Sequence, residues 1–82
     1  MKVTLNKKIP GEIEIEIATE FIKLQDFLKF ANAVPSGGMA KNVIVSGDVA
    51  VNGEVCLMRG KKLHPGDRVT FAGGAWVVRK GL

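Results

Sequence analysis

The chain has little of what would mark a secreted, membrane-bound or metal-binding protein. It has one cysteine, Cys56, and one histidine, His64, so it can form neither an internal disulfide nor a common zinc site with several sulfur ligands. No apolar run approaches the roughly 18 residues of a membrane span, and residues 1–5 lack the apolar core of a secretory signal. We therefore expect a cytoplasmic protein with no membrane partner, in which Cys56 is a small apolar filler.

The sequence also lacks the patterns that accompany catalysis. There is no phosphate-binding P-loop, no Ser/His/Asp or Cys/His set, and no pair of carboxylates at a spacing that suits acid–base work. The 82 residues suffice for one compact domain and leave little room for a dedicated substrate pocket. We expect a single domain over 1–82 that is not an enzyme, with no catalytic residues, cofactor or metal.

The positive charge is concentrated in the second half of the chain. Residues 1–35 carry five lysines and five acidic residues, whereas residues 36–82 carry seven basic and three acidic ones, which accounts for the net charge of +4. A basic region on a small domain indicates a polyanionic partner. There are no tyrosines, and the four phenylalanines and Trp76 mostly fall in apolar stripes, which favours recognition of backbone and shape over base stacking.

Alternating charged and β-branched residues predict a half-buried strand over 12–17. We expect its isoleucines to face the core and its glutamates to form a solvated acidic edge that opposes aggregation. A turn is expected at 10–11 and a short strand at 3–5. The residues expected to point inward are Ile13, Ile15 and Ile17, and those expected to point outward are Glu12, Glu14 and Glu16.

Two amphipathic helices follow. Apolar residues at 24, 27, 28 and 31 have helical spacing, and Pro35 is expected to end this helix because the residue before a proline avoids the helical region. Ser36 is a suitable N-cap for a second helix, whose apolar positions are 40, 43 and 44. Gly47 is expected to stop the second helix as the residue after its C-cap.

The rest of the chain reads as short strands joined by tight turns. Hairpin turns are predicted at Asn52-Gly53 and Gly73-Gly74, and a proline turn at 64–67. The strands lie at 49–51, 54–57, 68–71 and 75–79, with a basic loop over 58–63. The fold class is therefore α+β, a helix–turn–helix pair packed on a small, mainly antiparallel sheet.

The run from Leu24 to Val69 resembles the S-four RNA-binding domain, named for a ribosomal small-subunit protein. The matching features are Phe27-Leu28, Ser36, Ala40-Lys41, the Gly-x-Val-x-Val-Asn-Gly pattern at 47–53 and the Pro-Gly-Asp-Arg-Val run at 65–69. The resemblance implies an alpha-L motif, with its core at about 23–71, that binds structured RNA. It is nearest to short stand-alone bacterial proteins tied to the ribosome. Gly37 and Met39 depart from the family pattern, which often has an arginine and an acidic residue there.

Phosphate binding requires cations and free N–H groups on a rigid frame. The start of the second helix offers N–H donors and a positive dipole end, and the basic loop offers flexible cations. Neutralising about four phosphates, through Lys41, Arg59, Lys61 and Lys62, would give a salt slope near −3. We expect these cations to converge beside the opening of the second helix. The residues predicted to bind RNA are Lys23, Lys29, Ser36, Gly37, Gly38, Lys41, Asn42, Arg59, Lys61, Lys62 and Arg68.

The sequence thus predicts a monomeric domain that recognises structured RNA, such as ribosomal RNA or a ribosomal particle. The alternative is a protein-interaction module that keeps the fold without strong RNA affinity, for which Gly37 and Met39 are the motivation. DNA binding through the helix pair is a third reading, disfavoured because the second helix has few side chains suited to base edges.

Overall fold

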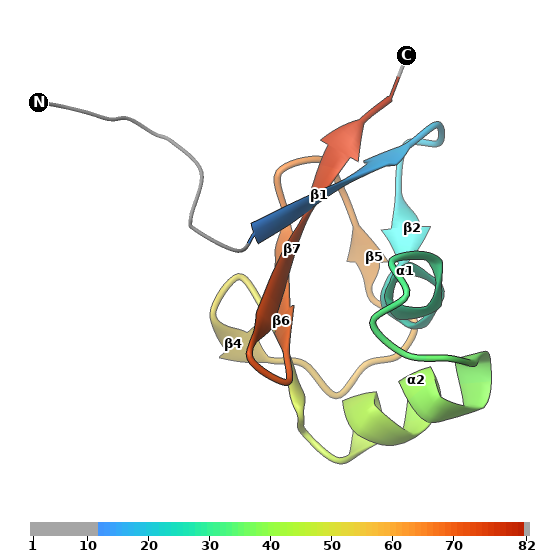
Figure 1. The fold of residues 1–82 in the computed structure, drawn as a ribbon, viewed down its shortest axis with the longest axis vertical. Helices are drawn as coiled ribbons and strands as arrows, with labels where there is room; N and C mark the ends of the chain where they lie inside the picture. The colour runs from blue at the N-terminus through green and yellow to red at the C-terminus, as the bar shows by residue number, and fades with distance from the viewer. Residues whose placement is uncertain (1–11, 82) are drawn as a thin grey trace, which may run out of the picture.

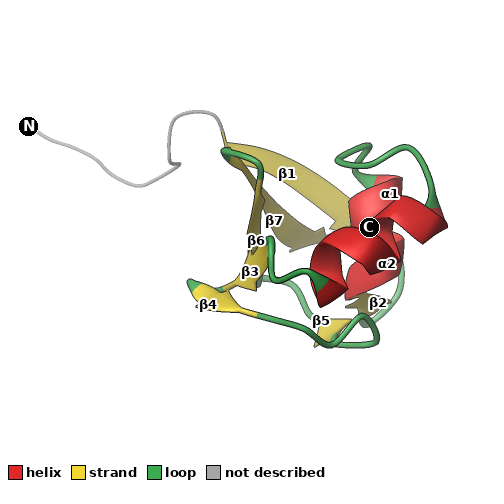
Figure 2. Cartoon of the chain, turned by 90° about the horizontal axis from the view of Figure 1, so that it is seen from below, coloured by secondary structure: helices red, strands yellow, loops and turns green. Residues whose placement is uncertain are grey.

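The computed structural model describes residues 12–81, so the expected strand at 3–5 and the turn at 10–11 lie outside the described residues. Two short helices pack beside a twisted sheet and a separate two-stranded ribbon (Figures 1 and 2). The elements are β1 (Glu12–Ile17), β2 (Ile22–Lys23), α1 (Leu24–Phe30), α2 (Gly37–Val45), β3 (Val49–Val51), β4 (Glu54–Val55), β5 (Lys62–Leu63), β6 (Arg68–Phe71) and β7 (Gly74–Lys80).

The main sheet has five strands in the order β1-β7-β6-β3-β4. All neighbours are antiparallel except the pair of β1 and β7, which is parallel. The expected α+β class and mainly antiparallel sheet are therefore confirmed. The antiparallel ribbon of β2 and β5 was not predicted, because two-residue strands leave no periodicity in a sequence.

The core lies between the helices and one face of the sheet. Leu24, Phe27 and Leu28 of α1 are fully buried, and Ala40 and Ile44 of α2 are as well. They meet alternate residues of β3, β6 and β7, since successive side chains of a strand point to opposite faces. Burial of this apolar surface is the main favourable term in folding. The sheet residues in this core include Val49, Val51, Val69, Trp76 and Val78.

Both helices end in the same backbone motif. In α2 the N–H of Asp48 donates to the Val43 carbonyl and the N–H of Gly47 to the Ile44 carbonyl, which is the Schellman pattern. Gly47 has φ +84°, so its predicted role as the residue after the C-cap is confirmed. The N-cap is also confirmed, because Ser36 Oγ accepts from the Met39 N–H at 3.2 Å.

The expected end of α1 is wrong by several residues. The helix stops at Phe30, and Asn32 takes the left-handed conformation with φ +60°. The N–H of Ala33 donates to the Leu28 carbonyl and closes a second Schellman motif. Asparagine tolerates this conformation better than most residues, so Asn32 ends the helix before Pro35 is reached.

Two strand boundaries also differ from the sequence prediction. The β6–β7 turn is centred on Ala72 and Gly73, both at positive φ, and Gly74 already pairs with Phe71. The predicted Gly73-Gly74 turn is thus displaced by one residue. The β4 strand ends at Val55 rather than residue 57, although the turn at Asn52-Gly53 forms as expected with both residues at positive φ.

The β1 strand follows its expected alternation only in part. Ile17 is buried, but Ile13 is 50% exposed, because β1 is an edge strand whose beginning lies on the side away from the helices (Figure 1). Glu12 was expected in water and is buried instead, where its carboxylate accepts from Arg68 Nε. Glu14 remains exposed and pairs with Arg79 at 3.4 Å. The acidic edge is therefore partly neutralised by the neighbouring strands.

A side-chain bridge ties the β3–β4 turn to the start of β6. Asn52 Oδ1 accepts from the Arg68 N–H at 2.9 Å, and Asn52 Nδ2 donates to Asp67 Oδ1 at 3.1 Å. The other oxygen of Asp67 accepts from the His64 N–H at 2.8 Å and so closes the predicted turn at 64–67. These bonds join the Asn52-Gly53 turn to the turn at 64–67, which directly follows the basic loop.

Candidate nucleic-acid interface

The start of α1 is capped by backbone from the basic loop. Lys23 occupies the N-cap position and provides no side-chain cap. Instead, the Leu24 N–H donates to the Lys61 carbonyl at 2.8 Å and the Gln25 N–H to the Arg59 carbonyl at 3.1 Å. These bonds satisfy N–H groups that a helix start leaves unpaired, and they hold the loop against α1. We call the four cations brought together here, Lys23, Arg59, Lys61 and Lys62, the basic cluster.

Two lysines of the basic cluster stand directly opposite each other. Lys23 of β2 and Lys62 of β5 are partners in the antiparallel register. Like charges in this position destabilise a strand pair, so the arrangement favours an anion that neutralises both. The ammonium of Lys62 lies 4.9 Å from the centre of the Phe21 ring, a cation–π contact. Within residues 12–81, no member of the basic cluster forms an ion pair.

A second group of predicted residues lies on α2. Lys41 and Asn42 are exposed, and so are Ser36, Gly37 and Gly38 at the start of the helix. A Cβ atom added at Gly37 would meet nothing within 4 Å, so the backbone there is open to close approach by a ligand. The nine-residue helix presents its N–H groups and positive dipole end at this point.

The residues that precede the basic loop lie beside the end of α2. A Cβ at Gly47, just after α2, would lie 3.8 Å from Leu57 and 3.9 Å from Val55, which precede the basic loop. Of the four cations expected to converge, Arg59, Lys61 and Lys62 lie on the loop that caps the start of α1, near Lys23, whereas Lys41 lies on α2. The ribbon of β2 and β5, which holds this loop at the start of α1, was not predicted from the sequence.

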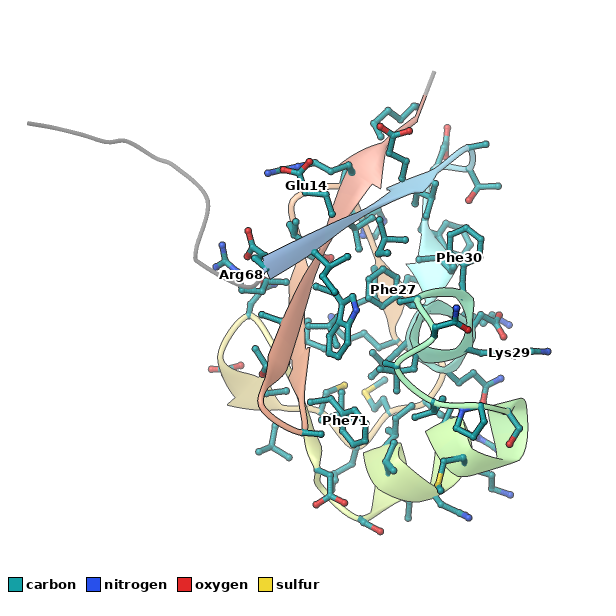
Figure 3. All side chains as sticks on the ribbon, in the orientation of Figure 1. Glu14, Phe27, Lys29, Phe30, Arg68 and Phe71 are labelled. Atoms are coloured by element: carbon teal, nitrogen blue, oxygen red, sulfur yellow. The ribbon has the colours of Figure 1, made fainter. Side chains whose placement is uncertain are left out.

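Lys29 and Arg68 lie apart from one another, on opposite sides of the view in Figure 3. Lys29 is exposed in the last turn of α1, beside Phe30, which is 60% exposed. Arg68 is engaged with the carboxylate of Glu12 on the outer face of the sheet. The geometry thus separates Arg68 from the basic cluster, and its role as an RNA contact stays a prediction.

Among residues 12–81, Asp67 is a titratable group whose pKa is shifted by its surroundings. Burial raises the pKa of this carboxyl, but hydrogen bonds from the His64 backbone and the Asn52 side chain, together with the electrostatic influence of His64 and Lys61, outweigh burial and lower it from its ordinary value. The carboxylate is therefore charged at neutral pH, and it accepts the hydrogen bond that closes the turn at 64–67.

Among residues 12–81, no cluster of three or more potential metal ligands occurs, and neither helix has the length and apolarity to cross a bilayer.

Comparison with known proteins identifies the family. The family model described as the S4 domain, the S-four domain of the sequence prediction, matches residues 15–79. The "Probable ribosome maturation protein RlbA" of Bacillus subtilis (strain 168) is 48% identical over 59 residues, which cover 72% of this chain and 83% of that protein. The solution structure of YbcJ from E. coli, described as revealing an alpha-L motif involved in RNA binding, aligns with a TM-score of 0.62 and 27% identity, covering 94% of this chain and 96% of YbcJ. The chain belongs to the S4 domain family.

Proposed function

We propose that this protein binds structured RNA, in the form of ribosomal RNA or a ribosomal particle, in the cytoplasm and without catalysis. The observation that carries the proposal is the basic cluster, in which two lysines face each other across a strand pair with no acidic partner among residues 12–81. The S4 family, the RNA-binding motif attributed to YbcJ and the ribosome maturation role attributed to RlbA support the same reading.

The mechanism is electrostatic. Four cations of the basic cluster neutralise phosphates, and Arg59 can hold one phosphate through two parallel hydrogen bonds. Backbone bonds from α1 fix the carbonyls of Arg59 and Lys61, so the cations project from an ordered frame and less entropy is lost on binding. Lys29, Lys41, Asn42 and the exposed start of α2 extend the surface beyond the cluster.

The salt dependence of binding tests this mechanism. Four neutralised phosphates predict that log affinity falls against log salt with a slope of about −3. Lys23→Ala and Lys62→Ala should each weaken binding to all sequences and reduce the slope by about 0.7–0.9. Lys80→Ala, at the exposed end of β7, is the matched control and should leave the slope unchanged. Affinity that does not respond to salt would reject the proposal.

A protein-interaction module is the second candidate, supported by exposed apolar side chains at Val45, Leu57 and Met58, which are 59–66% exposed. A domain of this kind would retain its partners after nuclease treatment and at high salt, whereas the RNA-binding reading predicts that they are lost.

A further inference from the structure

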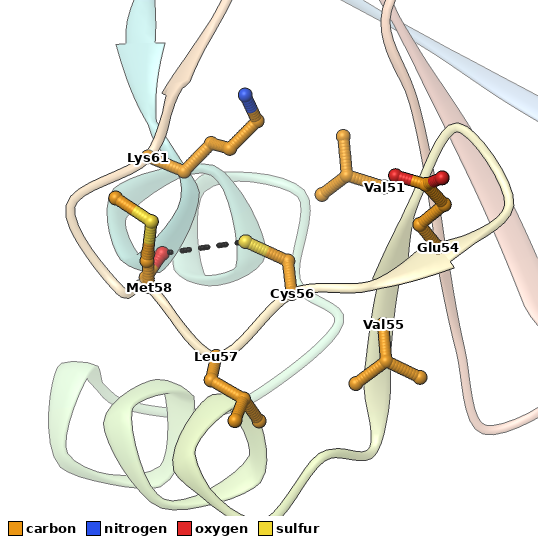
Figure 4. A pocket seen from close by; sticks show the side chains of 7 residues that line it. All are labelled: Val51, Glu54, Val55, Cys56, Leu57, Met58 and Lys61. Carbon is orange, nitrogen blue, oxygen red and sulfur yellow. Dashed lines mark hydrogen bonds between the residues drawn. The ribbon is translucent and has the colours of Figure 1, made fainter.

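A pocket lies directly beside the basic cluster, between β4 and the loop that leads to Lys61. Its volume is about 230 Å³. Figure 4 shows the side chains of Lys61 and Glu54 on opposite sides of the pocket, with Val51 and Cys56 between them. The pocket therefore has an apolar floor and one charge of each sign on its rim.

Both rim charges are available to a ligand. Glu54 and Lys61 are exposed, and neither forms an ion pair with another residue of the part of the chain that the structure describes. The carboxylate can only accept hydrogen bonds at neutral pH, and the ammonium can only donate them. A ligand that matches both groups carries N–H donors at one end and a negative charge at the other, with an apolar body between them.

Most of the side chains that line the pocket are apolar. Val55, Leu57 and Met58 line it and are 64%, 59% and 66% exposed, which is a large share of apolar surface for one short loop. The Cys56 thiol lies 3.7 Å from the Met58 carbonyl oxygen, and this contact helps to shape the loop. The thioether of a methionine makes favourable contacts with aromatic rings.

We propose that this pocket holds one unpaired nucleobase of the bound RNA, with the amino-bearing edge of the base at Glu54 and a flanking phosphate at Lys61. The inference rests on the proposed function. It follows because sequence-specific recognition of RNA targets unpaired bases, which proteins bind through apolar or aromatic faces and through hydrogen bonds to their edges.

The chemistry of Glu54 predicts which bases are preferred. Guanine presents two adjacent N–H donors on its pairing edge, and a carboxylate accepts such a pair with both oxygens. Adenine and cytosine each present one amino group. Uracil has no amino group, and its carbonyl oxygens would face the carboxylate. The pocket therefore favours guanine most and uracil least.

The pocket is also continuous with the basic cluster. Lys61 belongs to both, and its carbonyl accepts from the Leu24 N–H at 2.8 Å, so the position of this residue is fixed relative to the cations. An RNA chain held at the cluster can thus direct a neighbouring base into the pocket. An acidic peptide would satisfy Lys61 but would bring like charge against Glu54, so the charges favour a nucleotide.

Two hairpin RNAs that differ in one loop base, guanine or uracil, provide the test. Their dissociation constants are measured by fluorescence anisotropy at one salt concentration. The protein should bind the guanine hairpin at least about fivefold more tightly, the low end of discrimination by a good base contact. Glu54→Gln should abolish this preference. Glu20→Gln removes the same charge from an exposed position outside the pocket and should keep the preference.

The outcomes separate this inference from the proposed function. Salt-dependent binding of both hairpins with equal affinity would overturn the pocket assignment and leave RNA binding intact. A preference that survives Glu54→Gln, or that Glu20→Gln also abolishes, would overturn it as well. If the protein bound neither hairpin, or bound both without a response to salt, the proposed function and this inference would both be overturned.

Discussion

The bridge through Asp67 gives a prediction whose magnitude follows from the structure. Asp67→Ala removes the acceptor for the His64 N–H at 2.8 Å and for Asn52 Nδ2 at 3.1 Å. Shielded hydrogen bonds to a charged group contribute about 1.5–3 kcal/mol, and both of these lie near the surface, so we assign about 1 kcal/mol to each. The free energy of unfolding should fall by about 2 kcal/mol. For a domain of this size the midpoint of thermal unfolding should then fall by roughly 8–15 °C.

The same variant has a defined pH dependence. Burial raises the pKa of Asp67, but hydrogen bonds from His64 and Asn52 and nearby positive charge outweigh it, so the folded-state pKa lies below the ordinary value of a free aspartate. A carboxyl with a lowered folded pKa contributes stability above its unfolded pKa, and this stability is lost as the pH falls through the folded pKa. The difference in stability between the native protein and Asp67→Ala should be full at neutral pH and should shrink as the pH falls below the unfolded-state pKa and through the folded-state pKa of Asp67.

Urea unfolding followed by circular dichroism at neutral pH and at about pH 3 measures both effects. Asp48→Ala is the control, since Asp48 is exposed and its side chain makes no hydrogen bond to residues 12–81. It should change stability by less than about 0.5 kcal/mol. If Asp67→Ala were no worse than Asp48→Ala, or if its effect were the same at both pH values, the bridge would not stabilise the fold as described.

Three further substitutions probe the frame and the surface. Gly74→Ala places a Cβ 2.8 Å from Trp76 Cη2 and should lower the free energy of unfolding, measured in urea, by about 1–3 kcal/mol. Gly60→Ala, which has open space around the added Cβ, should change the free energy of unfolding little. Arg68→Met leaves a buried carboxylate unpaired and should lower the free energy of unfolding by about 2 kcal/mol, less than for a fully buried pair because the Arg68 side chain is 42% exposed. Gly37→Ala should stabilise α2 by about 0.5 kcal/mol but weaken RNA binding, measured by anisotropy, if a phosphate approaches the backbone there.

Much of the fold was readable because its main elements carry strong periodic patterns. The apolar spacing in both helices, the cap at Ser36 and the turns at Asn52-Gly53 and 64–67 all form as expected. These features depend on neighbours in sequence, so local chemistry is enough to predict them. The S-four resemblance, drawn from the same residues, was confirmed by the family match.

The structural features that the sequence did not reveal are contacts between residues far apart in the chain. The parallel pairing of β1 with β7, the ribbon of β2 with β5, and the ion pair of Glu12 with Arg68 each join distant segments. The capping of α1 by the basic loop belongs to the same class and leaves no local pattern. These long-range contacts place the basic loop at the start of α1, which local sequence patterns could not indicate.

We propose that RNA binds at the start of α1, where the residues of the basic cluster lie. Nuclear magnetic resonance of the isotope-labelled protein, titrated with a structured RNA at low salt, tests this most directly. We expect the largest backbone amide shifts at residues 21–25 and 59–63, with smaller shifts at the start of α2. Shifts centred on the outer face of β1 and β7, with residues 59–63 unchanged, would contradict it.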